Sequence, residues 1–309
     1  MILAVASGKG GTGKTTLAVN LASVFGAEVQ LLDCDVEEPN AHLFLLGTRT
    51  RTEVVAIPVP EVDESLCDGC GECGRFCQFH AIVSFGTKPL VFPEMCHGCG
   101  GCVRVCPRKA IRETDHAIGT VETSRTGNIS LVQGRLNVGA PMAPPLIRAV
   151  KARLRNGIPA ILDAPPGTSC AVIATLRGAD FVLLVTEPTP CGIHDLKLAV
   201  DVVRDLRIPF GVVVNRVGIG DDRVHAFCRT ESIPILLEIP DDRRIAEAYS
   251  RGELLVEALP EYVAHFERLR EAVLDGHRPI VMTPPGSRRG LPIRVQPHPN
   301  DKDERDAHE

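Results

Sequence analysis

The amino-acid sequence predicts an α/β protein built on a doubly wound, mostly parallel sheet, with a small α+β domain inserted into it. Helical patterns alternate with short runs rich in Val, Ile and Leu, which indicates right-handed βαβ units. The runs are apolar on consecutive residues, as in strands buried on both faces of a parallel sheet: Ile2–Ala6, Val29–Leu32, Ala160–Leu162, Phe181–Val185, Phe210–Val214 and Ile235–Glu238. The helical patterns are Lys14–Phe25, Pro145–Arg155, Ile193–Leu206, Asp222–Glu231, Arg243–Arg251 and Glu261–Leu274.

The alternation stops after Asp35 and resumes near Pro141. Most of the cysteines lie in this interval, so we expect residues 58–117 to form a small domain inserted into a main domain of residues 1–57 and 118–278. From about Pro279 the composition turns to Pro, Gly and Arg, and then to Asp, Lys and Glu. This composition predicts a flexible tail over residues 279–309.

The composition limits the classes of protein that need to be considered. The chain has 309 residues, of which 44% are hydrophobic and 24% charged, and its formal net charge is −5. These values are typical of a globular protein, and no apolar run approaches the roughly 20 residues that span a bilayer. The first residues lack the features of a signal peptide, and the absence of a basic excess disfavours nucleic acid as a partner. We therefore expect a cytoplasmic protein with no membrane partner.

A phosphate-binding loop follows the first predicted strand and leads into the first predicted helix. Its residues match the pattern G-x-x-x-x-G-K-[ST] in the context that this motif requires: Gly8, Lys9, Gly10, Gly11, Thr12, Gly13, Lys14, Thr15 and Thr16. Glycines allow successive backbone N–H groups to face phosphate oxygens, and the helix N-terminus adds its positive end. We expect Lys14 to reach the β and γ phosphates of ATP and Thr15 to offer its hydroxyl to Mg²⁺.

The second lysine of the loop, Lys9, makes the match more specific. The string K-G-G-T-G-K-T-T resembles the deviant Walker A motif of the MinD/ParA/Mrp group of P-loop ATPases, which includes the nitrogenase iron protein. The resemblance covers about Met1–Asn40 and Arg135–Asp275, and it implies a sheet of the P-loop NTPase type. It also implies that Lys9 reaches the phosphates of a facing subunit, so that ATP favours a homodimer or a heterodimer with a related ATPase.

Three aspartates follow predicted strands and resemble the switch residues of that group. The segment Asp33–Asn40 is similar to switch I, which implies that Asp35 orients the attacking water and that Asp33 helps to hold the Mg²⁺ shell. Asp163 begins a D-A-P-P-G segment similar to switch II, which implies the Walker B carboxylate and a Mg²⁺ contact. Together with Mg²⁺, Lys9 and Lys14 would stabilise the charge that develops during phosphoryl transfer to water. Aspartates at strand ends also serve as helix caps or turn residues, and that alternative stays open.

Two later segments resemble the adenine side of the site. Asn215 follows a predicted strand where the group places an adenine-contacting asparagine, and Pro240 and Asp241 resemble a second adenine-side loop. Both segments also suit ordinary turns.

The cysteine pattern predicts a second site. Eight of the twelve Cys occur between positions 67 and 106 as two copies of C-x2-C-x2-C-x3-C, the second followed by proline. In the bacterial ferredoxin run the fourth Cys of each copy ligates the other cluster. This rule assigns one [4Fe–4S] cluster to Cys67, Cys70, Cys73 and Cys106, and the other to Cys77, Cys96, Cys99 and Cys102. Zinc is the alternative, because four-cysteine zinc sites also use C-x2-C pairs.

The remaining cysteines carry weaker signals. Cys34, Cys191 and Cys228 are interpreted as small buried apolar residues. Cys170 lies seven residues after Asp163, a spacing similar to that of a cluster ligand in the nitrogenase iron protein, but the second ligand that such a bridging cluster needs has no counterpart.

Taken together, the motifs predict a dimerising Mg²⁺-dependent ATPase of MinD-like type with an inserted bacterial-ferredoxin-like domain. Its nucleotide state would be coupled to electron transfer, or to the handling of a metal–sulfur centre, through the two [4Fe–4S] clusters and a redox or metal–sulfur protein partner. One alternative is a ParA- or MinD-like positioning switch whose insert senses redox state. Another is an iron–sulfur cluster carrier of Mrp type, although the C-x-x-C motif of those carriers is not seen.

Overall fold

The computed structural model describes residues 1–86 and 88–274, which form a large sheet covered by helices and a smaller cysteine-rich unit. The predicted flexible tail, residues 279–309, lies outside the described residues. Within the described part, nine strands form one sheet in the order β11-β10-β9-β1-β8-β2-β7-β6-β3. The strands are β1 (Ile2–Ala6), β2 (Val29–Asp33), β3 (Thr48–Val62), β6 (Ile111–Thr126), β7 (Ile129–Leu136), β8 (Ala160–Asp163), β9 (Phe181–Thr186), β10 (Phe210–Val217) and β11 (Ile235–Pro240).

The prediction of a mostly parallel sheet is confirmed. Neighbouring strands from β11 to β7 run parallel, whereas β7 pairs with β6 and β6 with β3 in antiparallel fashion. All six strands predicted from apolar runs are present. The six predicted helices are also present, with their ends shifted by at most a few residues: α1 (Lys14–Ser23), α4 (Pro144–Lys151), α6 (Pro190–Asp205), α7 (Arg223–Thr230), α8 (Arg243–Ser250) and α10 (Val263–Leu274).

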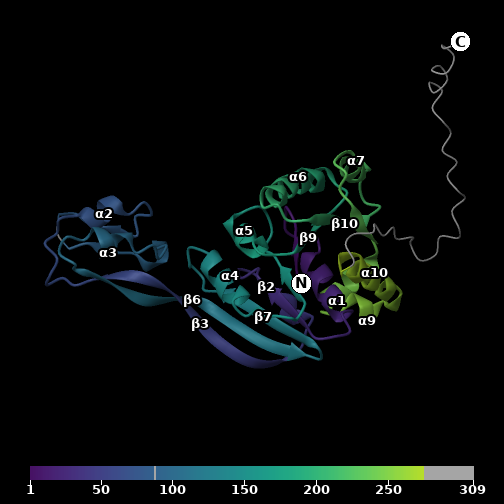
Figure 1. Cartoon of the computed structure of the whole chain (residues 1–309), viewed down its shortest axis with the longest axis horizontal. Coiled ribbons are helices and arrows are strands. Elements are labelled where there is room, and N and C mark those ends of the chain that lie inside the picture. The colour runs from purple at the N-terminus through teal and green to yellow at the C-terminus, as the bar shows by residue number, and fades with distance from the viewer. Residues whose placement is uncertain (87, 275–309) are drawn as a thin grey trace, which may run out of the picture.

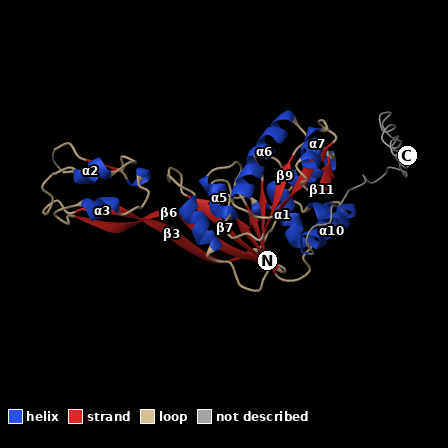
Figure 2. Ribbon diagram, turned by 45° about the horizontal axis from the view of Figure 1, so that its top comes forward, coloured by secondary structure: helices blue, strands red, loops and turns tan. Residues whose placement is uncertain are grey.

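The helices cover both faces of the sheet, as a doubly wound fold requires. Leu146 of α4 and Leu196 of α6 pack with Leu162 of β8 in one core cluster, together with residues of α5 (Cys170–Leu176) and α7. Leu17 of α1 and Phe266 of α10 belong to the core cluster on the opposite face, which also includes α9 (Leu255–Ala258). Figure 1 shows the same division, with α4 to α7 on one side and α1, α9 and α10 on the other, and Figure 2 shows α5 to α7 apart from α10 in a second view.

The interval between Asp35 and Pro141 differs from the prediction. It contains three strands of the main sheet, β3, β6 and β7, where the sequence pattern indicated a break. Strands β3 and β6 form a long antiparallel ribbon, and the expected domain limits fall inside it, where Ile57 faces His116 and Pro58 faces Asp115. We call the paired strands β3 and β6 the ribbon.

The cysteine-rich unit, residues 63–110, lies at the far end of the ribbon from the rest of the molecule (Figure 1). It is built from short elements: α2 (Glu72–Phe76), β4 (Ile82–Val83), β5 (Leu90–Val91) and α3 (Gly101–Val105). The two strands pair with each other, and α2 packs against α3. Short 3-10 turns complete the chain: η1 (Ala41–Leu43), η2 (Pro93–Met95) and η3 (Pro260–Tyr262). In the part of the chain that the structure describes, no helix is long and apolar enough to cross a bilayer.

Candidate functional site

A cavity of about 520 Å³ opens at the carboxyl ends of the central strands. Ligands of open α/β sheets bind at this edge. The phosphate loop borders the cavity between β1 and α1, and Gly13 adopts φ +95° immediately before Lys14 begins the helix. The lining brings together residues from segments far apart in the sequence, among them Gly10, Gly11, Gly13, Lys14, Thr15, Thr16, Asp35, Asn215, Pro240 and Asp241. The structure therefore places both predicted adenine-side segments on the same cavity as the loop.

Lys14 is buried at the base of this cavity. Burial lowers the pKa of its amine below the usual value, and the nearby carboxylates of Asp163 and Asp35 offset part of this decrease. The hydroxyl of Thr15 donates to Oδ2 of Asp163 over 2.5 Å. A buried ammonium beside carboxylates and a hydroxyl is suited to the phosphates of a nucleotide.

Asp163 offers a test of whether Mg²⁺ fits this position. Its carboxyl group is buried, and Oδ1 has no hydrogen-bond partner among the described residues. Burial, followed by the neighbouring charge of Asp33, raises the pKa of the Asp163 carboxyl. An orphaned carboxylate oxygen next to a threonine hydroxyl is the oxygen-donor set that Mg²⁺ prefers. The residues present thus fit the ion.

Asp33 anchors the chain that follows β2. Oδ1 accepts a hydrogen bond from the backbone N–H of Asp35 at 3.1 Å, and Oδ2 accepts from the N–H groups of Asn40 and Ala41 at 3.0 Å each. Burial raises the pKa of Asp33 to about 7. Asp35 lies on the cavity wall and is half-buried, and burial raises its pKa to about 6. In this structure the contacts of Asp33 fix the loop that presents Asp35.

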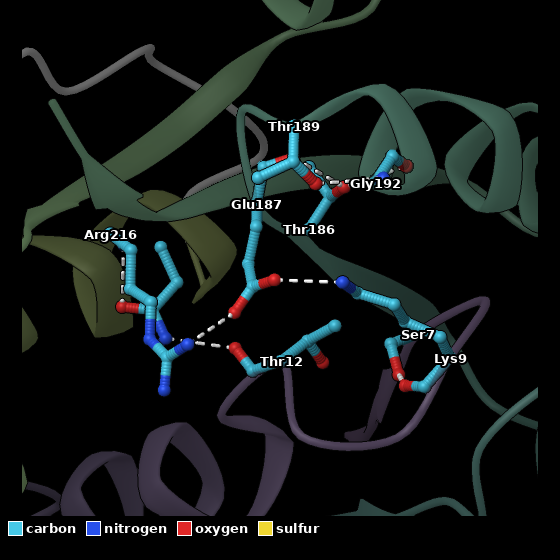
Figure 3. Close-up of polar contacts among 9 residues, drawn as sticks. Ser7, Lys9, Thr12, Thr186, Glu187, Thr189, Gly192 and Arg216 are labelled. Atoms are coloured by element: carbon cyan, nitrogen blue, oxygen red, sulfur yellow. Dashed lines mark hydrogen bonds and ion pairs between the residues drawn. The ribbon is translucent and has the colours of Figure 1, made fainter. Parts of the chain in front are cut away.

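Lys9 lies outside the lining of the cavity. Its ammonium group pairs with the carboxylate of Glu187 at 2.8 Å, and the guanidinium of Arg216 pairs with the other oxygen of Glu187 at 3.1 Å (Figure 3). Sequence reasoning did not single out Glu187 or Arg216. The position of Arg216 beside the predicted Asn215 was the one signal pointing to this corner of the molecule.

Two further cavities lie in the cysteine-rich unit, and each is lined by four of the eight clustered cysteines. One, of about 380 Å³, has Cys77, Cys96, Cys99 and Cys102 in its wall. The other, narrower at about 20 Å³, has Cys67, Cys70, Cys73 and Cys106. The fourth cysteine of each sequence copy therefore lies with the first three of the other copy.

The two halves of the unit repeat each other in backbone conformation. Helices α2 and α3 each begin after a glycine with positive φ, and His80 and Lys109 each adopt φ +53° three residues after the last cysteine of their copy. In the second half, two backbone N–H groups point at sulfur, one in each four-cysteine set: that of Gly98 lies 3.4 Å from Sγ of Cys96, and that of Ala110 lies 3.3 Å from Sγ of Cys106.

Burial raises the pKa of the Cys73 thiol, and the nearby thiols of Cys106 and Cys67 raise it further. Burial likewise raises the pKa of the Cys102 thiol, to about 11, with a further increase from Cys96 and Cys99. Among the described residues, no three His, Cys, Asp or Glu side chains are arranged to hold a single metal ion.

The isolated cysteines differ from the prediction in one case. Cys34 and Cys228 are buried, as expected, but Cys191 is exposed because it lies on the outer side of the first turn of α6. Cys170 is exposed at the start of α5.

Comparisons with known proteins agree with this geometry. The family model described as the CobQ/CobB/MinD/ParA nucleotide binding domain matches residues 3–256. The uncharacterized protein MJ0579 of Methanocaldococcus jannaschii is 35% identical over 259 residues, which cover 82% of this chain and 90% of that protein. An iron–sulfur cluster carrier protein of Aquifex aeolicus is 25% identical, covering 84% of this chain and 63% of the carrier. Among solved structures, the septum site-determining protein MinD of Pyrococcus horikoshii, complexed with Mg-ADP, has a similar fold at a TM-score of 0.55 and 20% identity, covering 89% of this chain and 97% of that one.

Proposed function

The chain belongs to the CobQ/CobB/MinD/ParA nucleotide-binding family, and from this membership we propose that it is a dimerising ATPase whose nucleotide state is coupled to two [4Fe–4S] clusters in the cysteine-rich unit. The observation that carries the proposal is the sorting of eight cysteines into two four-cysteine cavities. This sorting matches the crossed ligation of a two-cluster ferredoxin, in which the fourth Cys of each run serves the other cluster.

At the nucleotide site, this chain's residues divide the work of phosphoryl transfer to water. Lys14 places a buried positive charge beside the phosphates, and the backbone N–H groups of the phosphate loop orient them. Thr15 and Asp163 would hold Mg²⁺, with Asp33 supporting this shell through the loop that it anchors. Asp35 would position the attacking water. When bound, Mg²⁺ neutralises charge on the phosphate oxygens.

The carboxyl edge of the sheet offers a direct path between this site and the ribbon. The carbonyl oxygen of Val36, next to Asp35, accepts a hydrogen bond from the N–H of Leu136 at 2.8 Å. Leu136 pairs with Gly119 of β6. The side-chain amide of Asn137 then donates to the carbonyl oxygen of Ala117 at 3.0 Å. Movement of the Asp35 loop can therefore reach the strand that carries the cysteine-rich unit through two or three hydrogen bonds.

The clusters, when bound, would accept and donate single electrons, with potentials tuned by N–H groups that face the sulfurs. The N–H groups of Gly98 and Ala110 occupy such positions. A redox or metal–sulfur protein would exchange electrons or clusters with this unit. The carrier named among the relatives gives specific support to a second function, in which the bound cluster itself is the cargo.

The coupling is tested on anaerobically prepared protein by redox titration and analytical ultracentrifugation of the same samples. A non-hydrolysable ATP analogue with Mg²⁺ should favour the dimer and shift the cluster potential, whereas ADP should do so much less. Unchanged assembly and potential would contradict the coupling and favour a positioning switch. Transfer of iron and sulfide to an apo-ferredoxin, without a change of potential, would favour the carrier.

A matched pair of variants tests the path. Asn137→Ala removes the side-chain contact with Ala117 of β6 and keeps the backbone hydrogen bond of Asn137 to Ile118, so the dimer should persist while the shift in potential is reduced. Asn128→Ala is the control, because Asn128 makes the same type of contact, with the carbonyl oxygen of Ala27 at 2.6 Å, at the opposite end of β7. An equal loss of response in both variants would contradict the assigned path.

A further inference from the structure

The carboxylate of Glu187 is buried between two cations, Lys9 and Arg216 (Figure 3). The side chain of Glu187 is 7% exposed, whereas those of Lys9 and Arg216 are 30% and 51% exposed. A buried carboxylate that loses every counter-charge is strongly destabilising, so at least one of the two cations must stay. Either cation alone can meet that need, which leaves the other free to move.

The backbone around Glu187 is fixed by its own contacts. Glu187 follows β9, and its carbonyl oxygen accepts from the N–H of Thr189, which caps α6 by accepting from the N–H of Gly192 at 3.0 Å. A side chain at Gly192 would collide with the carbonyl oxygen of Glu187. The backbone that carries Glu187 is therefore held in place by contacts that do not involve Lys9.

The backbone of Lys9 is also fixed, but its side chain is more exposed than that of Glu187. The hydroxyl of Ser7 donates to the carbonyl oxygen of Lys9 at 2.5 Å. The ammonium group can consequently leave Glu187 by rotation of the side chain, without a change in the loop. Arg216 remains as the counter-charge of Glu187 when this happens.

We propose that Glu187 is a latch that holds Lys9 within its own subunit until nucleotide phosphates on a facing subunit compete for it. Glu187 is a positioning residue in this scheme. Arg216 keeps the buried carboxylate of Glu187 paired when Lys9 leaves, which lowers the free energy needed to release Lys9. The inference rests on the proposed function, since it requires that Lys9 acts across an ATP-dependent dimer. The latch sets the concentration of ATP at which the dimer forms.

Glu187→Gln tests the latch because it removes the charge and keeps the shape. In sedimentation experiments with a non-hydrolysable ATP analogue, the midpoint for dimer formation should fall about three- to fivefold, the effect of one partly exposed ion pair. Affinity of the monomer for ADP, measured in parallel, should stay the same. An unchanged or higher midpoint would overturn the latch, and a higher one would mean that Glu187 assists Lys9 in the dimer.

Arg216→Gln should shift the midpoint for dimer formation in the opposite direction to Glu187→Gln. It also provides a test if Glu187→Gln fails to fold. Without Arg216, Lys9 becomes the sole counter-charge of Glu187, so the midpoint should rise relative to the affinity of the monomer for ADP. A fall would contradict the proposal. Glu231→Gln is the matched control, because Glu231 pairs with Arg204 at 2.9 Å on the surface away from the loop, and its midpoint should equal that of the parent.

Lys9→Ala separates failure of the latch from failure of the proposed function. If the dimer still forms with the ATP analogue at the parental midpoint when Lys9 is absent, then Lys9 has no role across the interface and the proposed assembly is wrong. If Lys9→Ala abolishes the dimer while Glu187→Gln leaves the midpoint unchanged, the assembly stands and only the latch is wrong.

Discussion

The side-chain amide of Asn215 donates a hydrogen bond to the backbone carbonyl oxygen of Thr12 over 2.8 Å and so joins the end of β10 to the phosphate loop. The contact depends on the next residue of the loop. Gly13 has φ +95°, and a Cβ atom there would lie 2.6 Å from the amide nitrogen of Asn215. The absence of a side chain at Gly13 thus permits both the turn of the loop and its contact with the adenine-side segment.

Gly13→Ala should therefore lower the affinity for nucleotide at least about tenfold, because left-handed backbone strain of about 1–2 kcal/mol adds to the collision with Asn215. Isothermal titration with ATP and Mg²⁺ measures the effect. Gly26→Ala is the control, since Gly26 has φ +69° with open space around it. Gly26→Ala should lower thermal stability and leave the affinity unchanged. Equal affinities in the two variants would contradict the role given to Gly13.

Lys14→Ala and Asp35→Ala should separate binding from hydrolysis. Loss of the Lys14 ammonium should weaken ATP binding at least about tenfold, since hydrogen bonds to charged groups contribute about 1.5–3 kcal/mol. Asp35→Ala should keep binding and reduce turnover about 100-fold or more, the range of a group that positions or deprotonates a nucleophile. Phosphate release measures turnover, and Lys197→Ala, a change to an exposed lysine of α6, should affect neither quantity. Turnover of Asp35→Ala at the parental rate would remove its catalytic assignment.

The cysteine cavities predict the metal content and its distribution. Chain prepared without oxygen should contain about eight iron and eight sulfide per monomer, as two four-iron clusters require. Cys73→Ser and Cys106→Ser should damage the same cluster and give the same electron paramagnetic resonance spectrum, although the two positions belong to different sequence copies. Cys99→Ser should damage the other cluster. Two zinc ions without sulfide would contradict the ferredoxin assignment, and a shared spectrum for Cys99→Ser and Cys106→Ser would contradict the crossed pairing.

His42 predicts how stability depends on pH. It lies directly after the Asp35 loop, burial and the charge of Arg135 lower its pKa from the usual 6.5, and its Nδ1 is buried without a partner among the described residues. As the pH falls below 6.5, the unfolded chain takes up a proton that the folded chain resists, so stability is lost until the lowered pKa is passed. His42→Gln should remove this loss, so the stability of the variant relative to the parent should rise as the pH falls below 6.5 in thermal unfolding of the nucleotide-free protein. The same substitution at His194, an exposed residue of α6, should leave the curve as it is. An unchanged slope for His42→Gln would contradict the assignment.

The buried part of the sheet could be predicted from the sequence because its strands are apolar on consecutive residues. The ribbon could not. Its first strand begins with Thr and Arg in alternation from Thr48 to Thr52, and all five residues are exposed. This first part of β3 has no buried face and therefore no apolar period to detect, and the buried Ile57 and Val59 come only later in the strand. What stabilises β3 is pairing with β6, more than 60 positions away near its start, and such pairing is not encoded in a local pattern.

The candidate site divides in the same way. The phosphate loop and the cysteine runs are local motifs, because their ligand must be wrapped by neighbouring residues of the chain. Glu187 follows an ordinary buried strand and carries no motif of its own. Its significance comes from Lys9 and Arg216, which three separate strand ends bring to one corner of the molecule. The role of Asp33 also became visible only through the backbone groups that it binds.

The ribbon has a mechanical consequence. At about 3.3 Å per residue, the eight steps along β6 from Gly119 to Ile111 span roughly 26 Å. The pairing is regular from Ala56 and Ala117 to Val62 and Ile111, and a register shift between Val55 and Ala56 lies where the ribbon leaves the main sheet, so we expect the paired strands to act as a lever arm with its fulcrum at that edge. A turn of about 5° at the fulcrum would swing the tip by about 2 Å over this length. A small rotation beside the nucleotide site would therefore move the cysteine-rich unit far enough to make or break side-chain contacts there.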